Sequence, residues 1–235
     1  EAIGAVAREH GLWFHVDGSW GASIILSEKQ RYRFRGLEKA NSFSWNPHKM
    51  MNIPLICSVV LINDTGVLYR QLSTKDTDYI FHDNENAACD LGPASLQCGK
   101  RVDSLKLWLA WKYHGDQGYA QRIDHLFDLA QYATAKVEAH PSLELLAPTQ
   151  TLNVNFRYVT ESGDDLNTFN ETLRELLLRE GKSMVNYCRL NGKVSIRLIL
   201  VNPDVTMADM DRFFDNFLEA AARLEAEAKV PAEGA

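Results

Sequence analysis

Three short, almost entirely apolar segments near the start of the chain constrain its fold most strongly. They are residues 12–17 (LWFHVD), 41–45 (NSFSW) and 57–62 (CSVVLI). Segments of this length and composition are typical of buried β-strands, and the longer connections between them favour parallel strands that are covered on both faces. The first part of the chain is therefore predicted to be an α/β structure.

The second half of the chain has a different pattern. Residues 151–159 and 193–200 alternate apolar and polar side chains, so each is predicted to be a strand with one buried face. Helices with one apolar face are expected over residues 166–177 and from Thr206 onward, with Thr206 and Asp209 as a capping pair. This combination predicts a small α+β domain with helices on one face of an antiparallel sheet.

The boundary between the two patterns lies in a helical region. One helix is expected over residues 102–115, ending at Gly115, and a second over residues 119–140. We therefore expect domains at residues 1–116 and 117–235.

Composition limits the possible functions. The chain has 46% hydrophobic and 24% charged residues and a net charge of −6, which is ordinary for a soluble protein and does not favour nucleic-acid binding. Its longest apolar run, residues 53–62, is about half the length of a membrane span, so no membrane association is expected. Four scattered cysteines without a C-x-x-C pair favour a reduced, cytoplasmic protein. Because the chain starts without Met inside a predicted helix, we expect it to be part of a longer protein.

Several common catalytic motifs are not met. Residues 94–101 lack the first glycine and the final hydroxyl of a phosphate-binding loop. Ser19 follows Gly18 directly, so the nucleophile-elbow pattern G-x-S-x-G is not met either. The seven histidines have no convincing metal-ligand spacing, and no metal site is expected.

Asp17 and Lys49 remain as candidates for chemistry. Asp17 ends an apolar strand, and ligands bind at the carboxyl ends of strands in α/β sheets. Lys49 follows the next predicted strand and an Asn-Pro turn, beside the apolar Met50 and Met51. A loop-capping aspartate and a solvated lysine are the alternative interpretations. Together, an amine and a carboxylate are what pyridoxal 5'-phosphate (PLP) needs, the first for its aldehyde and the second for its ring nitrogen.

The residues around both side chains resemble a known family. The segments HVDGSWG, NSFSWNPHKMMNIPLICS and LQCGKRVDSLKLWLAWKYHGDQG are similar to the group II PLP-dependent decarboxylases of fold type I. Within that group the chain is most similar to glutamate decarboxylase and cysteine sulfinate decarboxylase, from residue 1 to about residue 225. The resemblance implies the C-terminal part of a PLP-binding large domain, a mainly parallel sheet with helices, followed by a small α+β domain.

The resemblance also implies roles at the cofactor. Lys49 would bind PLP covalently, and Asp17 would pair with the pyridinium nitrogen. Asn46 and His48 would help to hold the cofactor phosphate. Gly18 stands where the family usually has alanine against the ring.

Two further residues would act on the substrate. Tyr79, in the long polar loop of residues 74–95, matches a mobile-loop tyrosine that returns a proton to the substrate after CO₂ leaves. Arg197 matches an arginine that grips a substrate carboxylate, and its strand pattern places it on the polar face. An ordinary loop aromatic and a solvated arginine are the alternatives.

The expected function is α-decarboxylation of an acidic amino acid by a homodimer. L-Glutamate is the first choice, and aspartate and cysteine sulfinate follow closely, because Pro54 and Ile56 depart from the family pattern and leave the substrate open. The alternatives are an aromatic-amino-acid decarboxylase or aldehyde synthase, and a truncated chain that acts only by binding a partner. The family's upstream half carries a ring-stacking histidine and further phosphate contacts, so the isolated 235 residues are expected to be inactive.

Overall fold

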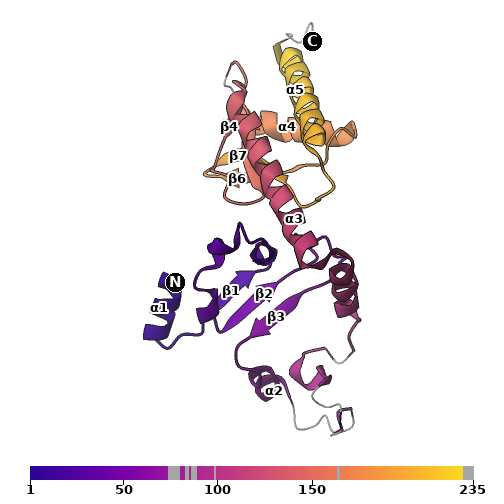
Figure 1. Ribbon diagram of the computed structural model, residues 1–235. Coiled ribbons are helices and arrows are strands. Elements are labelled where there is room, and N and C mark those ends of the chain that lie inside the picture. The colour runs from indigo at the N-terminus through magenta and orange to yellow at the C-terminus, as the bar shows by residue number, and fades with distance from the viewer. Residues whose placement is uncertain (74–79, 83–84, 86–88, 98, 163–164, 230–235) are drawn as a thin grey trace. The chain divides into compact units, whose positions relative to one another are not determined.

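The computed structural model describes residues 1–73, 80–82, 85, 89–97, 99–162 and 165–229 (Figure 1). Its internal contacts divide the chain into two compact units, Glu1–Ala120 and Gln121–Ala235, here called unit 1 and unit 2. The division falls shortly after residue 116, where the sequence pattern changes. Half of the long polar loop expected over residues 74–95 lies outside the described residues, namely 74–79, 83–84 and 86–88.

Unit 1 contains a three-stranded sheet in the order β1-β2-β3. Strand β1 (His15–Gly18) runs parallel to β2 (Ser42–Trp45), and β2 runs antiparallel to β3 (Val59–Ile62). The three expected strands are confirmed, but the expectation that all are parallel is wrong. The connection over residues 46–58 contains no helix to return the chain to the other end of the sheet, so β3 pairs antiparallel.

Short helices connect and flank these strands. They are α1 (Ala2–Glu9), α2 (Val67–Leu72) and the 3₁₀ helices η1 (Ala22–Leu26), η2 (Arg31–Phe34), η3 (Leu37–Lys39) and η5 (Gly92–Ala94). Helix α1 agrees with the helical start of the sequence, whereas the 3₁₀ helices carry no clear periodic pattern.

The strands of unit 1 are less covered than expected. Leu12 and Trp13, before β1, are 61% and 52% exposed, and Val60 and Leu61 of β3 are 57% and 53% exposed. The expectation of strands buried on both faces is therefore wrong for the described chain. One cluster of buried side chains lies between the turn after β2 and the first part of helix α3, where Trp45 meets Trp111 edge to face at 6.1 Å.

Helix α3 (Asp103–Ala139) is broken at Gly115, as expected. Gly115 has φ 66° and ψ 176°, a conformation that is accessible almost only to glycine. The two helices predicted from the sequence are thus the two parts of α3. No helix within the described residues is both long and apolar enough to cross a membrane.

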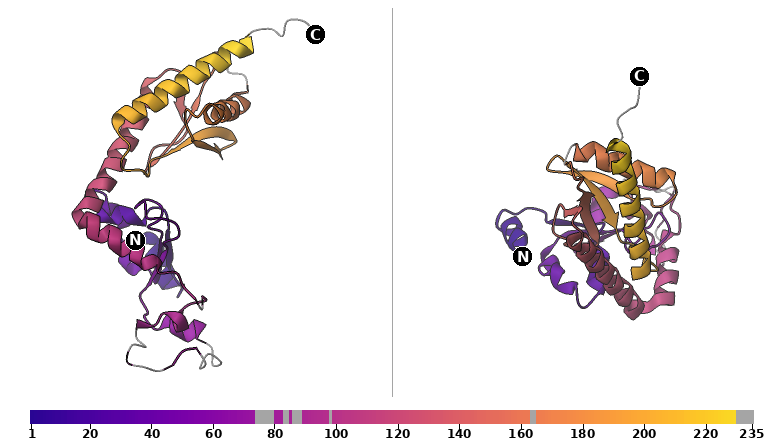
Figure 2. Two further views of the ribbon diagram at one scale, coloured as in Figure 1. Left: turned by 90° about the vertical axis from the view of Figure 1, so that its right-hand side faces the viewer. Right: turned by 90° about the horizontal axis from the view of Figure 1, so that it is seen from above.

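Unit 2 contains an antiparallel sheet in the order β4-β5-β7-β6. The strands are β4 (Leu143–Leu145), β5 (Asn153–Tyr158), β6 (Asn186–Leu190) and β7 (Lys193–Ile199). Helices α4 (Leu166–Arg179) and α5 (Met207–Lys229) lie on one face of this sheet (Figure 2). Phe156 of β5 packs against Phe214 and Phe217 of α5, with ring centroids 5.7 and 5.3 Å apart. The α+β fold expected for this part is confirmed.

The alternation of β5 and β7 sorts their side chains as predicted. The apolar set is buried, namely Leu152, Val154, Phe156, Tyr158, Val194, Ile196, Leu198 and Leu200. Arg197 is exposed. The capping pair is also confirmed, because the Thr206 N–H donates to Asp209 Oδ2 (2.8 Å) and the Asp209 N–H donates to Thr206 Oγ1 (3.2 Å).

Candidate functional site

Asp17 lies at the carboxyl end of β1, where two donors converge on one of its oxygens. Asp17 Oδ1 accepts hydrogen bonds from the Ser19 N–H (2.9 Å) and from the Ser44 hydroxyl on β2 (3.0 Å). The backbone and side chain of Ser19, then the Ser44 hydroxyl and the charge of Lys49, lower the pKa of Asp17 from 3.8 to about 2. Asp17 is therefore a carboxylate at neutral pH and is suited to pair with a cationic group.

Lys49 lies in the turn that follows β2. Its N–H donates to the Asn46 carbonyl (3.0 Å), and its Nζ donates to Ser19 Oγ (3.3 Å). The next two residues, Met50 and Met51, are only 2% and 4% exposed. The core thus anchors the turn while the Lys49 side chain stays half-buried beside Ser19. The structure brings Asp17 and Lys49 together through this serine.

His48 fixes the same turn to the segment before β3. Its Nδ1 lies 2.6 Å from the Cys57 carbonyl and 3.2 Å from the Cys57 backbone nitrogen. One ring nitrogen cannot both donate and accept, and the shorter contact favours donation to the carbonyl. With its Nδ1 proton used in this way, His48 can donate to a phosphate through Nε2 only when the ring is protonated. The phosphate-binding roles of His48 and Asn46 stay predictions.

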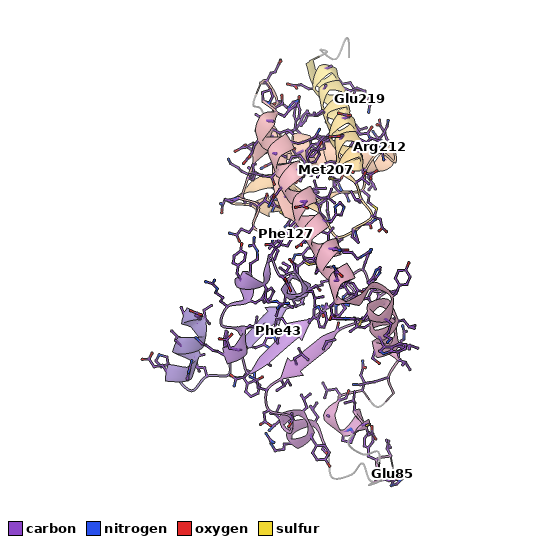
Figure 3. The ribbon with its side chains drawn as sticks, viewed as in Figure 1. Phe43, Glu85, Phe127, Met207, Arg212 and Glu219 are labelled. Carbon is purple, nitrogen blue, oxygen red and sulfur yellow. The ribbon has the colours of Figure 1, made fainter. Side chains whose placement is uncertain are left out.

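Gly18 is required by packing behind the site. A Cβ at this position would lie 2.4 Å from Cε2 of Phe43 and 2.9 Å from the Cβ of Ala22. The free side of Gly18 therefore faces Phe43, which lies on β2 (Figure 3). A role for Gly18 beside the cofactor ring stays a prediction.

Residues 54–56, which include the two departures from the family pattern, are hydrogen-bonded to α3. Lys106 Nζ donates to the carbonyls of Pro54 (3.1 Å) and Ile56 (2.7 Å). The Leu55 and Ile56 side chains remain 73% and 59% exposed. This segment thus presents apolar side chains from a backbone that Lys106 holds in place.

Tyr79 and Arg197 are the two residues predicted to act on the substrate. Tyr79 lies outside the described residues. Arg197 is exposed on β7 in unit 2, where its strand partners are Asn155 and Asn186. The substrate-facing roles of both residues stay predictions.

Sequence reasoning missed Ser19 and Ser44. Ser19 was considered only as a failed nucleophile motif. Ser44 faces Asp17 because the two are paired in the register of β1 and β2. The signal that could have found Ser44 is the strand alternation that places Ser42 and Ser44 on the face opposite to Phe43.

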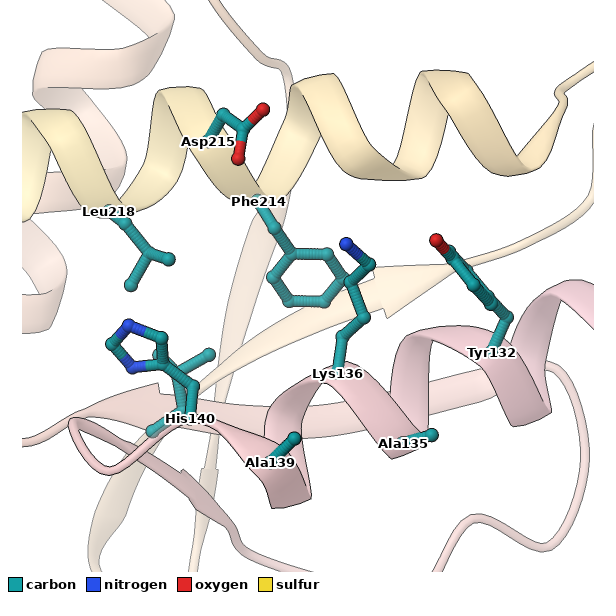
Figure 4. A pocket seen from close by; sticks show the side chains of 9 residues that line it. Tyr132, Ala135, Lys136, Ala139, His140, Phe214, Asp215 and Leu218 are labelled. Carbon is teal, nitrogen blue, oxygen red and sulfur yellow. The ribbon is translucent and has the colours of Figure 1, made fainter.

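Unit 2 contains a surface pocket that is lined by its own residues. It has a volume of about 470 Å³ and lies between α3 and α5, where Figure 4 shows Tyr132 and Lys136 of α3 beside Phe214 of α5. The Tyr132 hydroxyl donates to Asp211 (2.6 Å), and Lys136 forms an ion pair with the same carboxylate. Among the described residues, no three His, Cys, Asp or Glu side chains are placed to hold a metal ion.

Comparison with known proteins gives consistent matches over this chain. The model of the pyridoxal-dependent decarboxylase conserved domain matches residues 1–159. A cysteine sulfinic acid decarboxylase from Homo sapiens is 37% identical over 232 residues, which cover 93% of this chain and 47% of that protein. An L-aspartate decarboxylase from Metarhizium robertsii is 42% identical over 175 residues, which cover 73% of this chain and 34% of that protein.

Solved structures match the fold as well. The crystal structure of mouse CSAD in the apo form superposes with a TM-score of 0.86 at 34% sequence identity, over 94% of this chain and 48% of that chain. This chain thus spans about half the length of that structure and of the human relative.

Proposed function

Because the chain belongs to the pyridoxal-dependent decarboxylase family, we propose that the protein containing it releases the α-carboxylate of an acidic L-amino acid as CO₂. One observation carries the proposal. An ionised carboxylate, Asp17, and an amine, Lys49, are joined through Ser19 beside the ends of two parallel strands. This arrangement offers one group for each end of a PLP ring.

The residues present fit PLP. The Asp17 carboxylate, with its pKa lowered to about 2, is charged at neutral pH and would form a charge-assisted hydrogen bond with a protonated pyridine nitrogen. The Lys49 amine would hold the cofactor through its aldehyde group. When bound, the cofactor supplies a ring that accepts the electrons of the bond broken at the substrate Cα.

Other side chains of the chain would act on the substrate. The Arg197 guanidinium would orient an acidic group through paired hydrogen bonds, a geometry that suits carboxylates. Tyr79 would return a proton to Cα after CO₂ has left, which matches its expected position in a loop that gates the site. Asn46 and His48, in the turn of Lys49, would hold the cofactor phosphate.

We propose that the acidic group of the substrate lies on Cβ. The relatives described above are named for cysteine sulfinate and L-aspartate, and both of these amino acids carry the acid there. L-Glutamate, the first choice from the sequence, carries it one methylene farther from Cα and becomes the next candidate. The aromatic alternative has less support, because the two curated relatives described above are named for acidic amino acids.

A substrate panel tests this function. The full-length protein with PLP is given L-aspartate, L-cysteine sulfinate, L-glutamate and L-tryptophan, and CO₂ and the organic product are measured. We expect CO₂ and an amine from an acidic amino acid, and no turnover by Lys49→Ala. An aldehyde product or a preference for tryptophan would support the aromatic alternative, and no CO₂ from any of the four would contradict the proposal.

We propose that the active form is a homodimer and that residues 1–235 alone are inactive. Around the start of α3, apolar side chains at helical spacing are exposed: Val102 (70%), Leu105 (48%), Trp108 (57%), Leu109 (53%) and Tyr113 (85%). Such a stripe is typical of an interaction surface, and we propose that a second copy covers it. Light scattering of the full-length protein should show a dimer that Trp108→Glu weakens.

Tyr69→Glu on α2 is a matched control, because Tyr69 is 58% exposed and lies outside this stripe. If both variants remain dimers, other surfaces join the copies. Turnover by residues 1–235 alone would contradict the proposed inactivity.

We also propose a reducing, cytoplasmic location. The support is that Cys57, Cys89 and Cys188 form no disulfide within the part of the chain that the structure describes. Recovery of the full-length protein in a membrane or secreted fraction would contradict it.

A further inference from the structure

Ser19 contacts both groups that the proposed function assigns to the cofactor. Its N–H donates to Asp17 Oδ1 at 2.9 Å, and its hydroxyl accepts from Lys49 Nζ at 3.3 Å. The Ser19 side chain also helps to lower the pKa of Asp17. Ser19 thus connects, through hydrogen bonds, two side chains that are 32 positions apart in the sequence.

The direction of this link follows from the chemistry of the three groups. An ammonium group only donates hydrogen bonds and a carboxylate only accepts them, whereas a hydroxyl has one donor and two acceptor positions. Lys49 Nζ therefore donates to the Ser19 hydroxyl, while the Ser19 N–H donates to Asp17. In a direct ion pair, the Lys49 amine and the Asp17 carboxylate would use their hydrogen-bonding positions on each other. The Ser19 hydroxyl instead provides the Lys49 amine with a different partner.

The backbone fixes Ser19 in this position. The bond from its N–H to the side chain two residues earlier is an Asx turn, which sets the direction of the chain as it leaves β1. Behind this turn, Gly18 fits closely against Phe43, so the end of β1 cannot shift easily. Ser44 provides a separate donor to Asp17, which remains if the Ser19 hydroxyl is removed.

We infer that Ser19 is a positioning residue whose hydroxyl holds the Lys49 amine at a spacing from Asp17 that lets one PLP ring engage both. The inference rests on the proposed function, because it needs Lys49 and Asp17 to act on the same cofactor. This spacing should affect the rate at which PLP reacts with Lys49. In the cofactor-free protein, the Lys49 amine already lies where the PLP aldehyde is expected when the ring nitrogen contacts Asp17.

The test compares two aldehydes on the cofactor-free, full-length protein. PLP or propanal is added, cyanoborohydride traps the product over time, and mass spectrometry measures the labelled fraction of the Lys49 peptide. Propanal has no ring nitrogen and does not need the alignment with Asp17. We expect Ser19→Ala to lower the ratio of the PLP rate to the propanal rate about fivefold, as expected for loss of one hydrogen bond to a charged group.

Two variants serve as matched controls. Ser19→Thr keeps the hydroxyl and should keep a ratio close to that of the unchanged protein. Ser44→Ala removes a donor to Asp17 but leaves the contact with Lys49, so it should lower the ratio less than Ser19→Ala. Thermal unfolding checks that each variant is folded, and Ser19→Gly replaces Ser19→Ala if the latter does not fold.

The outcomes separate this inference from the proposed function. If PLP labels Lys49 in the unchanged protein and Ser19→Ala has the same ratio, the inference is wrong and the function stands. Equal slowing with both aldehydes would also overturn it, because the hydroxyl would then affect the amine without aligning it. If PLP does not label Lys49 in the unchanged protein, the proposed function fails first and the inference fails with it.

Discussion

Asp17 and Ser44 are partner residues of the parallel strands β1 and β2, and the Ser44 hydroxyl donates to Asp17 Oδ1 at 3.0 Å. The strand register brings these side chains together on the face opposite to Gly18 and Phe43. Ser44 therefore supports the carboxylate from a neighbouring strand, whereas Ser19 supports it from the following turn.

Ser44→Ala should weaken this support. The loss of one hydrogen bond to Asp17 raises the pKa of its carboxyl toward the ordinary value and loosens its orientation. We expect the decarboxylation rate of the full-length protein to fall about threefold to tenfold, the effect of a typical single hydrogen bond. Ser73→Ala, at the end of α2, is the control, and an equal rate in both variants would contradict the role of Ser44.

Asp17 should remain ionised over the whole working range of pH. Its pKa is lowered to about 2, so its stabilising effect is present above the ordinary value of 3.8 and is lost as the pH falls toward 2. Between about pH 5 and pH 9, the decarboxylation rate should therefore show no rise or fall that is caused by titration of Asp17. Asp17→Asn should lower the rate at every pH without shifting the pH at which the rate rises or falls. A rise or fall that disappears in this variant would show that Asp17 titrates there.

Gly18→Ala should destabilise the protein. The added Cβ would lie 2.4 Å from Phe43 Cε2, so the packed ring must move. We expect the free energy of unfolding to fall by about 1–3 kcal/mol, as in other overpacked cores. Urea unfolding tests the contact. Phe43→Leu should lower the free energy of unfolding less in the Gly18→Ala variant than in the unchanged protein, because the different side chain relieves the clash. Additive costs would contradict the predicted contact.

Arg197→Lys should raise the KM for the acidic substrate. Lysine keeps the positive charge but loses the planar pair of donors that binds a carboxylate. We expect a KM about tenfold higher with a smaller change in kcat, in line with one lost hydrogen bond to a charged group. Arg189→Lys on β6 is the control, because Arg189 forms an ion pair with Glu171. If both variants keep the original KM, Arg197 does not bind the substrate.

The elements with a clear periodic pattern could be predicted from the sequence. Strands β5 and β7 follow their alternation, and α3 is broken at Gly115 as its sequence indicates. Strands β4 and β6 were not predicted, because both are short edge strands whose side chains do not alternate cleanly in burial. The antiparallel direction of β3 was not predicted. It depends on the absence of a helix in residues 46–58, the connection from β2 to β3.

The candidate site could be predicted only in part for a similar reason. Asp17 and Lys49 stand out locally, one at a strand end and the other in a distinctive turn. Ser44 becomes part of the site only through strand register, and Ser19 only through the turn that follows Asp17. The contact of Ser44 with Asp17 and that of Ser19 with Lys49 join residues 27 and 30 positions apart, so they become visible only when the strand register and the turn are known.

The role of Lys49 as the PLP-binding lysine is tested most directly by locating the covalent bond to PLP. The full-length protein is saturated with PLP, reduced with borohydride and digested, and the labelled peptide is sequenced by mass spectrometry. We expect one phosphopyridoxyl group on Lys49 and none in the Lys49→Ala variant. A label on another lysine, such as Lys106, or no label at all would contradict it.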